Sequence, residues 1–269
     1  MKTHFFLIDC ILFLCSNSLC AQKRKGQTGK EPLFGKELAS YTVTSNELSG
    51  ACFYLVGGHG GPDPGAIGIY QGRQLHEDEY AYDIVLRLAR ELMMRGAKVH
   101  MIIQDKKDGI RSGNILANSK RETCMGRAIP LNQVERLKQR SRKINELYRK
   151  DKSKYKRAIF VHVDSRSAGT QTDVYFYHAP GSSKGEQLAK NLQKTFTQKY
   201  AKHQPGRGFS GTVSERGLYV LRNTTPVGVF LELGNIRNKQ DQKRLVIPNN
   251  RQALARWIAD GIVADYKKK

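Results

Sequence analysis

The chain has 269 residues, of which 39% are hydrophobic, so it can bury a packed core and general disorder is excluded. Lys and Arg number 46 against 24 Asp and Glu. The resulting net charge of +22 points to an anionic partner, namely nucleic acid, an acidic membrane or an anionic cell-wall polymer. The five cysteines form no repeated Cys-x-x-Cys pattern, which excludes a disulfide scaffold and a zinc ribbon.

The first 21 residues have the order of a secretory signal peptide. Lys2 is followed by an apolar run over residues 5–15, broken only by Asp9, and then by small residues at a cleavage site. The run is too short to span a bilayer as a mature anchor. Lipidation at Cys20 is an alternative, although a large residue precedes this cysteine where a small one is expected. A buried N-terminal helix is the other alternative.

Removal of residues 1–21 leaves a mature chain that we expect to be exported, and therefore periplasmic or secreted. Residues 22–45 are polar and predict a linker, and residues 46–269 predict the functional domain. No later segment is apolar enough to cross a bilayer. Cys52 and Cys124 remain, and nothing in the sequence indicates whether they pair.

Strand and helix patterns alternate along the domain. We predict strands at residues 51–56, 98–104, 158–163, 173–178 and 227–233, and helices at residues 78–95, 130–150, 185–200 and 251–266. Residues 105–129 are polar and predict a long surface loop. The alternation predicts a single α/β domain whose central sheet, mostly parallel or mixed, has helices on both faces. At this length, two small domains are the alternative.

Polar side chains stand at the ends of three apolar strands. His59 lies in the glycine-rich run 57–66, His162 follows an apolar strand, and Glu232 is embedded in one. A carboxylate in an apolar strand costs several kcal/mol unless it is paired or coordinated. With Glu77, at the start of the first long helix, the two histidines match a catalytic zinc site that keeps one position open for water.

Each of these residues also has a structural interpretation. A single strand histidine is commonly a hydrogen-bonded core residue, and Glu77 belongs to an acidic run that favours a helix N-terminus. Glu232 is alternatively half of a buried ion pair. Spacing alone does not bring the four side chains together.

The run His59-Gly60-Gly61-Pro62-Asp63-Pro64-Gly65-Ala66 resembles the first metal motif of the zinc-dependent N-acetylmuramoyl-L-alanine amidases, the amidase_3 family of bacterial cell-wall hydrolases. The resemblance continues in order through residues 77–88, 137–145, 160–165 and 217–238, and it covers about residues 51–265. Gly57, Gln104 and Asn235 depart from the family's common residues, and the 105–129 loop is longer than usual. These departures bear on the fit of the substrate more than on the chemistry of the site.

The resemblance implies that Zn²⁺ binds His59, Glu77 and His162, and that Glu232 is the catalytic acid/base. The implied reaction is hydrolysis of the amide bond between N-acetylmuramic acid and L-alanine in peptidoglycan. Residues 46–269 would form the amidase domain. His76 and Glu79 are rival ligands next to Glu77, and neither is expected to face the same way as Glu77 at a helix start.

Three alternatives remain open at this stage. The basic surface fits contact with an anionic envelope, or it simply aids solubility. A non-enzymatic binder of an anionic polymer or nucleic acid explains the charge but not the histidines and glutamates, and no nucleic-acid module is recognisable. A zinc amidase that cuts a different bond is the third alternative. Oligomeric state, and gating by residues 105–129 or by a partner, are not predictable.

Overall fold

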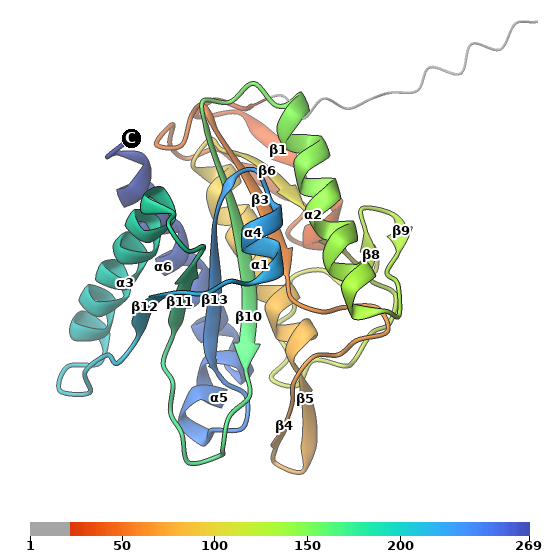
Figure 1. The fold of residues 1–269 in the computed structure, drawn as a ribbon, viewed down its shortest axis with the longest axis vertical. Helices are drawn as coiled ribbons and strands as arrows, with labels where there is room; N and C mark the ends of the chain where they lie inside the picture. The colour runs from red at the N-terminus through yellow and green to blue at the C-terminus, as the bar shows by residue number, and fades with distance from the viewer. Residues whose placement is uncertain (1–21) are drawn as a thin grey trace, which may run out of the picture.

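A six-stranded sheet forms the centre of the computed structural model, which describes residues 22–269 (Figure 1). Its strands are β3 (Ala51–Gly57), β6 (Lys98–Met101), β10 (Tyr155–Asp164), β11 (Tyr175–His178), β12 (Thr212–Glu215) and β13 (Val227–Asn235). They lie in the order β12-β11-β13-β10-β3-β6. All neighbouring pairs are parallel except β11 and β13, which are antiparallel. The prediction of a mixed α/β sheet is confirmed.

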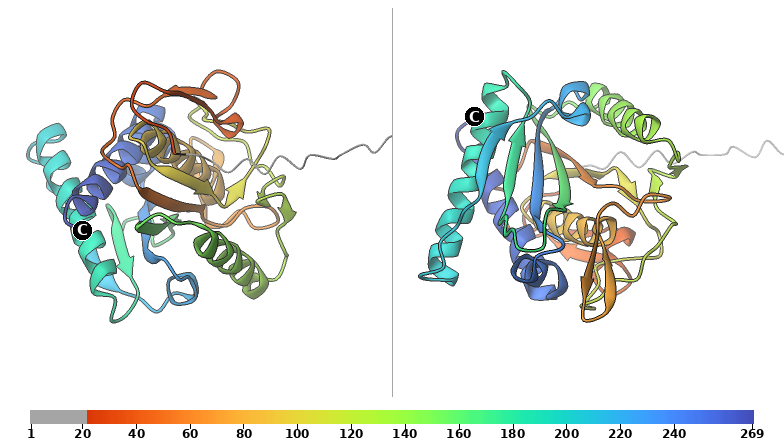
Figure 2. Two further views of the ribbon diagram at one scale, coloured as in Figure 1. Left: turned by 90° about the horizontal axis from the view of Figure 1, so that it is seen from above. Right: turned by 60° about the horizontal axis from the view of Figure 1, so that its bottom comes forward.

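Helices cover both faces of this sheet, as predicted. They are α1 (Glu77–Met94), α2 (Gln133–Lys150), α3 (Ser183–His203), α4 (Tyr219–Asn223), α5 (Lys239–Val246) and α6 (Pro248–Tyr266). On β3, Phe53 and Leu55 join the larger core with α1, α3, α5 and α6. Tyr54 and Val56 point to the other face, into the smaller core under α2 and α4. Helices α3 and α2 accordingly lie on opposite sides of the sheet (Figures 1 and 2).

The parallel strands give the molecule two distinct poles. The carboxyl ends of β3, β10 and β13 meet at one pole, where the strand-end residues of the sequence analysis lie. Both ends of the described chain lie at the other pole. There the amide of Gln22 donates to the carbonyl of Leu48, at 3.3 Å, and the hydroxyl of Tyr266 donates to the carbonyl of Ser49.

Residues 22–45 are packed against the domain, which differs from the linker predicted there. The segment contains β1 (Thr28–Lys30), the 3₁₀ helix η1 (Pro32–Phe34) and β2 (Ser40–Thr42), and β1 and β2 pair antiparallel. Phe34 and Val43 are each 1% exposed. Because the segment is polar overall, its composition did not indicate that these two side chains are buried. The signal peptide predicted over residues 1–21 lies outside the described residues.

Two further segments contain structure that the sequence pattern did not predict. A hairpin of β4 (Ile67–Tyr70) and β5 (Arg73–His76) precedes α1. Residues 105–129, predicted as a surface loop, contain β8 (Thr123–Cys124) and β9 (Arg127–Ala128), which form a small sheet with β7 (Ile103–Gln104).

Both cysteines of the described chain, Cys52 and Cys124, are buried and free. None of the helices within residues 22–269 has the length and apolarity needed to cross a membrane.

Candidate metal and catalytic site

His59, Glu77 and His162 converge at the carboxyl-end pole of the sheet. Nε2 of His59 lies 3.2 Å from one carboxylate oxygen of Glu77, and Nδ1 of His162 lies 2.9 Å from the other. One candidate ligand atom from each residue lies within 4.8 Å of the other two. The structure therefore brings together three side chains that are separated by 18 and 85 positions in the sequence.

Two glycines make this approach sterically feasible. A Cβ atom on Gly58, directly after β3, would lie 2.4 Å from the ring of His162. A Cβ on Gly65 would lie 2.6 Å from the ring of His59 and 2.7 Å from the carboxylate of Glu77, and Gly65 has a φ of +69°. A larger residue at Gly58 would displace His162, and a larger residue at Gly65 would displace His59 and Glu77.

Glu77 occupies the first position of α1, immediately after the β4–β5 hairpin. Its two oxygens accept backbone N–H bonds from Ala66, at 2.8 Å, and from Val163, at 3.0 Å. These bonds fix the carboxylate between two separate chain segments. Because both oxygens also meet a histidine, the side chain is held in one orientation.

The two rival ligands point elsewhere. His76, the residue before α1, contacts the side chain of Gln74 at 3.2 Å. Glu79 forms an ion pair with Arg111 at 2.7 Å. Of the three neighbouring candidates, only Glu77 contacts the histidines.

Glu232 stands beside His162 because β10 and β13 are parallel neighbours in which these two residues are paired. The His162 ring stacks on Phe230, with 4.2 Å between ring centroids, so the imidazole is packed from one side. The Glu232 side chain is 9% exposed, and its Oε2 has no hydrogen-bond partner among the described residues. All four predicted site residues line one cavity of about 440 Å³.

Asp63 is a site residue to which the sequence analysis assigned no role. Its carboxylate lies 2.8 Å from Nδ1 of His59, the ring nitrogen that faces away from Glu77, and 2.6 Å from a guanidinium nitrogen of Arg136. A carboxylate on the far nitrogen is the usual support of a metal-binding histidine, because it fixes the tautomer and the ring orientation. The available signal was the position of Asp63, four residues after His59 in the glycine-rich motif.

The charges at the site influence one another strongly. Burial alone lowers the pKa of His59, but the carboxylates of Asp63 and Glu77 outweigh it and raise the pKa to about 10. Burial raises the pKa of Glu77, yet the two imidazoles bring it below its usual range. Burial also raises the pKa of Glu232 well above its usual range, and the carboxylates of Glu77 and Asp164 raise it further. The site thus stabilises a positive charge next to Glu77.

These residues fit a bound zinc ion. Imidazole nitrogen and carboxylate oxygen are both zinc ligands, and three protein ligands are typical of catalytic sites. The three residues line a cavity that Glu232 lines as well, and Oε2 of Glu232 has no hydrogen-bond partner among the described residues. A cation bound here would replace the proton of His59 between the two carboxylates.

The model of the Amidase_3 family, described as N-acetylmuramoyl-L-alanine amidase, matches residues 54–264. The chain belongs to this family. The resemblance read from the sequence motifs is thereby confirmed.

Individual relatives agree with this assignment. The germination-specific N-acetylmuramoyl-L-alanine amidase of Bacillus subtilis (strain 168) is 25% identical over 242 residues, which are 86% of each chain. An uncharacterised cell wall amidase of Bacillus anthracis is 27% identical over 236 residues, and the match covers 84% of this chain but only 37% of that longer protein.

Solved structures have the same fold at lower identity. The N-acetylmuramoyl-L-alanine amidase from Clostridium difficile 630 aligns with a TM-score of 0.58 and 19% identity, over 81% of this chain and 98% of that one. The CwlD amidase from Clostridioides difficile, solved in complex with the GerS lipoprotein, aligns with a TM-score of 0.59 and 18% identity, over 81% and 99% of the two chains.

The departures from the family pattern lie around the cavity rather than in it. Asn235 is fully buried, and its amide donates to the carbonyls of Ser167 and Thr170 at 2.9 and 2.8 Å. It therefore organises the loop that follows His162. No residue of the 105–129 segment lines the cavity.

Proposed function

We propose that the Amidase_3 domain of this chain, residues 46–269, hydrolyses the amide bond between N-acetylmuramic acid and L-alanine in peptidoglycan. A zinc ion bound by His59, Glu77 and His162 would be its cofactor. The observation that carries the proposal is the convergence of these three side chains within 4.8 Å, beside the unpartnered carboxylate of Glu232.

Zinc in this site would supply Lewis-acid polarisation of the scissile carbonyl and a water of lowered pKa. The protein residues have separate tasks. Asp63 orients His59, and Glu77 balances the charge of the metal. Glu232 accepts the proton of the attacking water at a carboxylate oxygen and then donates it to the leaving amine, acting first as base and then as acid. Its position in the cavity, without a competing partner, supports this role.

The arginine side chains that line the cavity favour an anionic substrate. Arg136, Arg140 and Arg216 all line it, and Arg216 has no carboxylate partner within 4 Å among the described residues. The stem peptides of peptidoglycan carry free carboxylates, which these guanidinium groups would attract. The net charge of +22 would add a longer-range attraction to an anionic envelope, and this attraction would weaken with salt.

We also propose that the protein is exported, to the periplasm or to the exterior, after cleavage of residues 1–21. The charged, apolar and small-residue order of this segment motivates the proposal. N-terminal sequencing of envelope material should give a mature start near Gln22. A mature protein that retained residues 5–15 would contradict it.

The decisive experiment is digestion of purified peptidoglycan, with mass analysis of the products. We expect products with a free L-alanine amine and an intact glycan strand, loss of activity after chelation, and recovery with Zn²⁺. Full activity in metal-stripped protein would contradict the zinc assignment. Products cut at another amide would instead redefine the bond that is hydrolysed, while the metal dependence remains.

A further inference from the structure

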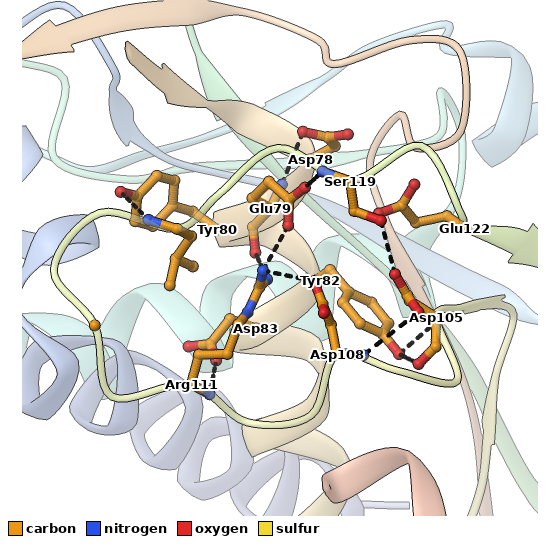
Figure 3. A network of polar contacts seen from close by, with 12 residues as sticks. Asp78, Glu79, Tyr80, Tyr82, Asp83, Asp105, Asp108, Arg111, Ser119 and Glu122 are labelled. Carbon is orange, nitrogen blue, oxygen red and sulfur yellow. Dashed lines mark hydrogen bonds and ion pairs between the residues drawn. The ribbon is translucent and has the colours of Figure 1, made fainter. Parts of the chain in front are cut away.

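Asp78, Glu79 and Glu122 form a second cluster of carboxylates, outside the catalytic cavity (Figure 3). Asp78 and Glu79 belong to the first turn of α1, whereas Glu122 comes from the 105–129 segment. One carboxylate oxygen from each residue lies within 4.8 Å of the other two. The three residues are only 3%, 1% and 5% exposed, so water screens little of the repulsion between their carboxylates.

The hydrogen bonds of the cluster leave one fully buried oxygen without a partner. Glu79 accepts from Arg111 at 2.7 Å and from the backbone N–H of Ser119. Glu122 accepts the N–H of Gly61 at 2.9 Å, and one oxygen of Asp78 accepts the N–H of Glu79 at 2.9 Å. The other oxygen of Asp78 is buried and has no hydrogen-bond partner. A buried acceptor without a donor is uncommon and requires an explanation.

The cluster also has fewer cations than carboxylates. Within residues 22–269, Arg111 is the cationic group that pairs with Glu79, and neither Asp78 nor Glu122 has a cation within 4 Å. One guanidinium therefore faces three buried carboxylates, and burial together with the carboxylates of Glu79 and Glu122 raises the pKa of Asp78 to about 8, so a bound cation would replace its proton. Buried charges in proteins are normally paired or coordinate a metal, and a divalent cation would balance this cluster.

We propose that Asp78, Glu79 and Glu122 form a binding site for a hard divalent cation, with Ca²⁺ preferred over Mg²⁺. Carboxylate oxygen is the ligand that both ions use. Ca²⁺ is favoured because it accepts several carboxylates in flexible geometry, whereas Mg²⁺ usually retains several waters. A site in which every side chain is at most 5% exposed has little space for such waters.

A cation here would connect three parts of the chain. It would join the start of α1 to the 105–129 segment, and through Glu122 it would reach Gly61, two residues after His59. The expected consequence is a more stable arrangement of the loop that carries His59. This inference depends on the geometry of the cluster and not on the proposed amidase reaction.

Calorimetric titration of the full-length, zinc-loaded protein with CaCl₂, and separately with MgCl₂, tests the site. We expect one Ca²⁺ to bind per chain in addition to the zinc, with weaker binding of Mg²⁺ and a rise in Tm with calcium. Absence of binding by either ion up to millimolar concentration would overturn the proposal, and it is the result expected if a shared proton neutralises Asp78 and Glu122. Calcium binding that disappears when the first site is filled with zinc would also overturn it.

Two variants assign the binding to the cluster. Asp78→Asn and Glu122→Gln should each weaken calcium binding by roughly tenfold or more, because each removes one charged ligand. Zinc content should stay at one ion per chain. In calcium-free solution, the Tm of Asp78→Asn should equal that of the wild-type protein or exceed it. The carboxylate that is replaced has no cationic partner in the protein, so its removal breaks no ion pair. Glu135→Gln, the same change on the exposed face of α2, should bind calcium as the wild type does. Wild-type calcium affinity in either cluster variant would refute the assignment.

Discussion

Replacement of Glu232 by glutamine separates a catalytic role from a structural one. The amide has nearly the size of the carboxylate but cannot accept the proton of the attacking water. A positioned acid/base contributes about 10²–10⁴-fold to a rate, so kcat should fall by roughly that factor. This loss corresponds to about 3–5 kcal/mol of transition-state stabilisation. Zinc should remain bound, because Glu232 is not among the three converging ligand residues.

The same substitution should have little effect on folding. No hydrogen bond or ion pair reaches the Glu232 side chain from the described residues, and the repulsion from the carboxylates of Glu77 and Asp164 exceeds the attraction by His59 and Arg216. Loss of its charge therefore removes repulsion, and Tm should be unchanged or higher. If Glu232 were instead half of a buried ion pair, breaking the pair would cost about 3–5 kcal/mol. For a protein of this size that cost lowers Tm by roughly 6–20 °C.

The assay combines kcat, zinc content and Tm on one preparation, with Glu186→Gln on the exposed face of α3 as the matched control. We expect a folded, zinc-loaded variant with strongly reduced turnover and a control that behaves as the wild type. Near-normal turnover in the folded, zinc-loaded variant would refute the role of Glu232. A large drop in Tm with normal turnover of the folded fraction would support the ion pair instead.

Three further predictions concern the ligands and the fold. Glu77→Ala should lose zinc and Glu79→Ala should retain it, and a metal assay with the reverse result would show that the ligand register is wrong. Asp63→Asn should weaken zinc affinity by roughly 10–100-fold without removing a ligand, because it no longer orients His59, and unchanged affinity would show that this support is dispensable. Asp173 tests the pH dependence of stability. Burial raises its pKa, but two guanidinium groups and a serine outweigh this and hold the pKa at about 2. Its contribution of about 2 kcal/mol is therefore fully present above pH of about 4 and is lost as the pH falls through about 2. Asp173→Asn, which tolerates the local φ of +51°, should remove this part of the acid dependence, and an unchanged difference in unfolding free energy between neutral and acidic pH would contradict it.

The sequence predicted the sheet and its strand-end residues because both depend on local patterns. The apolar runs before His59 and His162 are continuous, so these strands and their polar ends were recognisable. The position of Glu77 between the two histidines was not derivable in this way. It depends on the β4–β5 hairpin, which turns the chain back so that the first residue of α1 faces the strand ends.

The packing of residues 22–45 against the domain could not be predicted from the sequence for a related reason. Phe34 and Val43 are isolated apolar residues in a polar stretch, and a local pattern does not reveal a partner far along the chain. The N–H of Ile110 donates to the carbonyl of Phe34 at 3.1 Å, and the N–H of Thr44 donates to that of Met94 at 2.7 Å. Both contacts join segments that are at least 50 residues apart. Polar composition therefore identified these residues correctly as a surface segment, but it did not show that the segment packs against the domain.

The position of Gln22 and Tyr266, at the pole opposite the catalytic cavity, has a practical and a biological consequence. Any polypeptide joined to either end of the described chain emerges at the pole of the sheet opposite His59. An affinity tag, a fluorescent protein or a surface tether at either end would therefore leave the mouth of the cavity unobstructed. Attached to a surface in this way, the domain would direct its cavity outward, away from that surface.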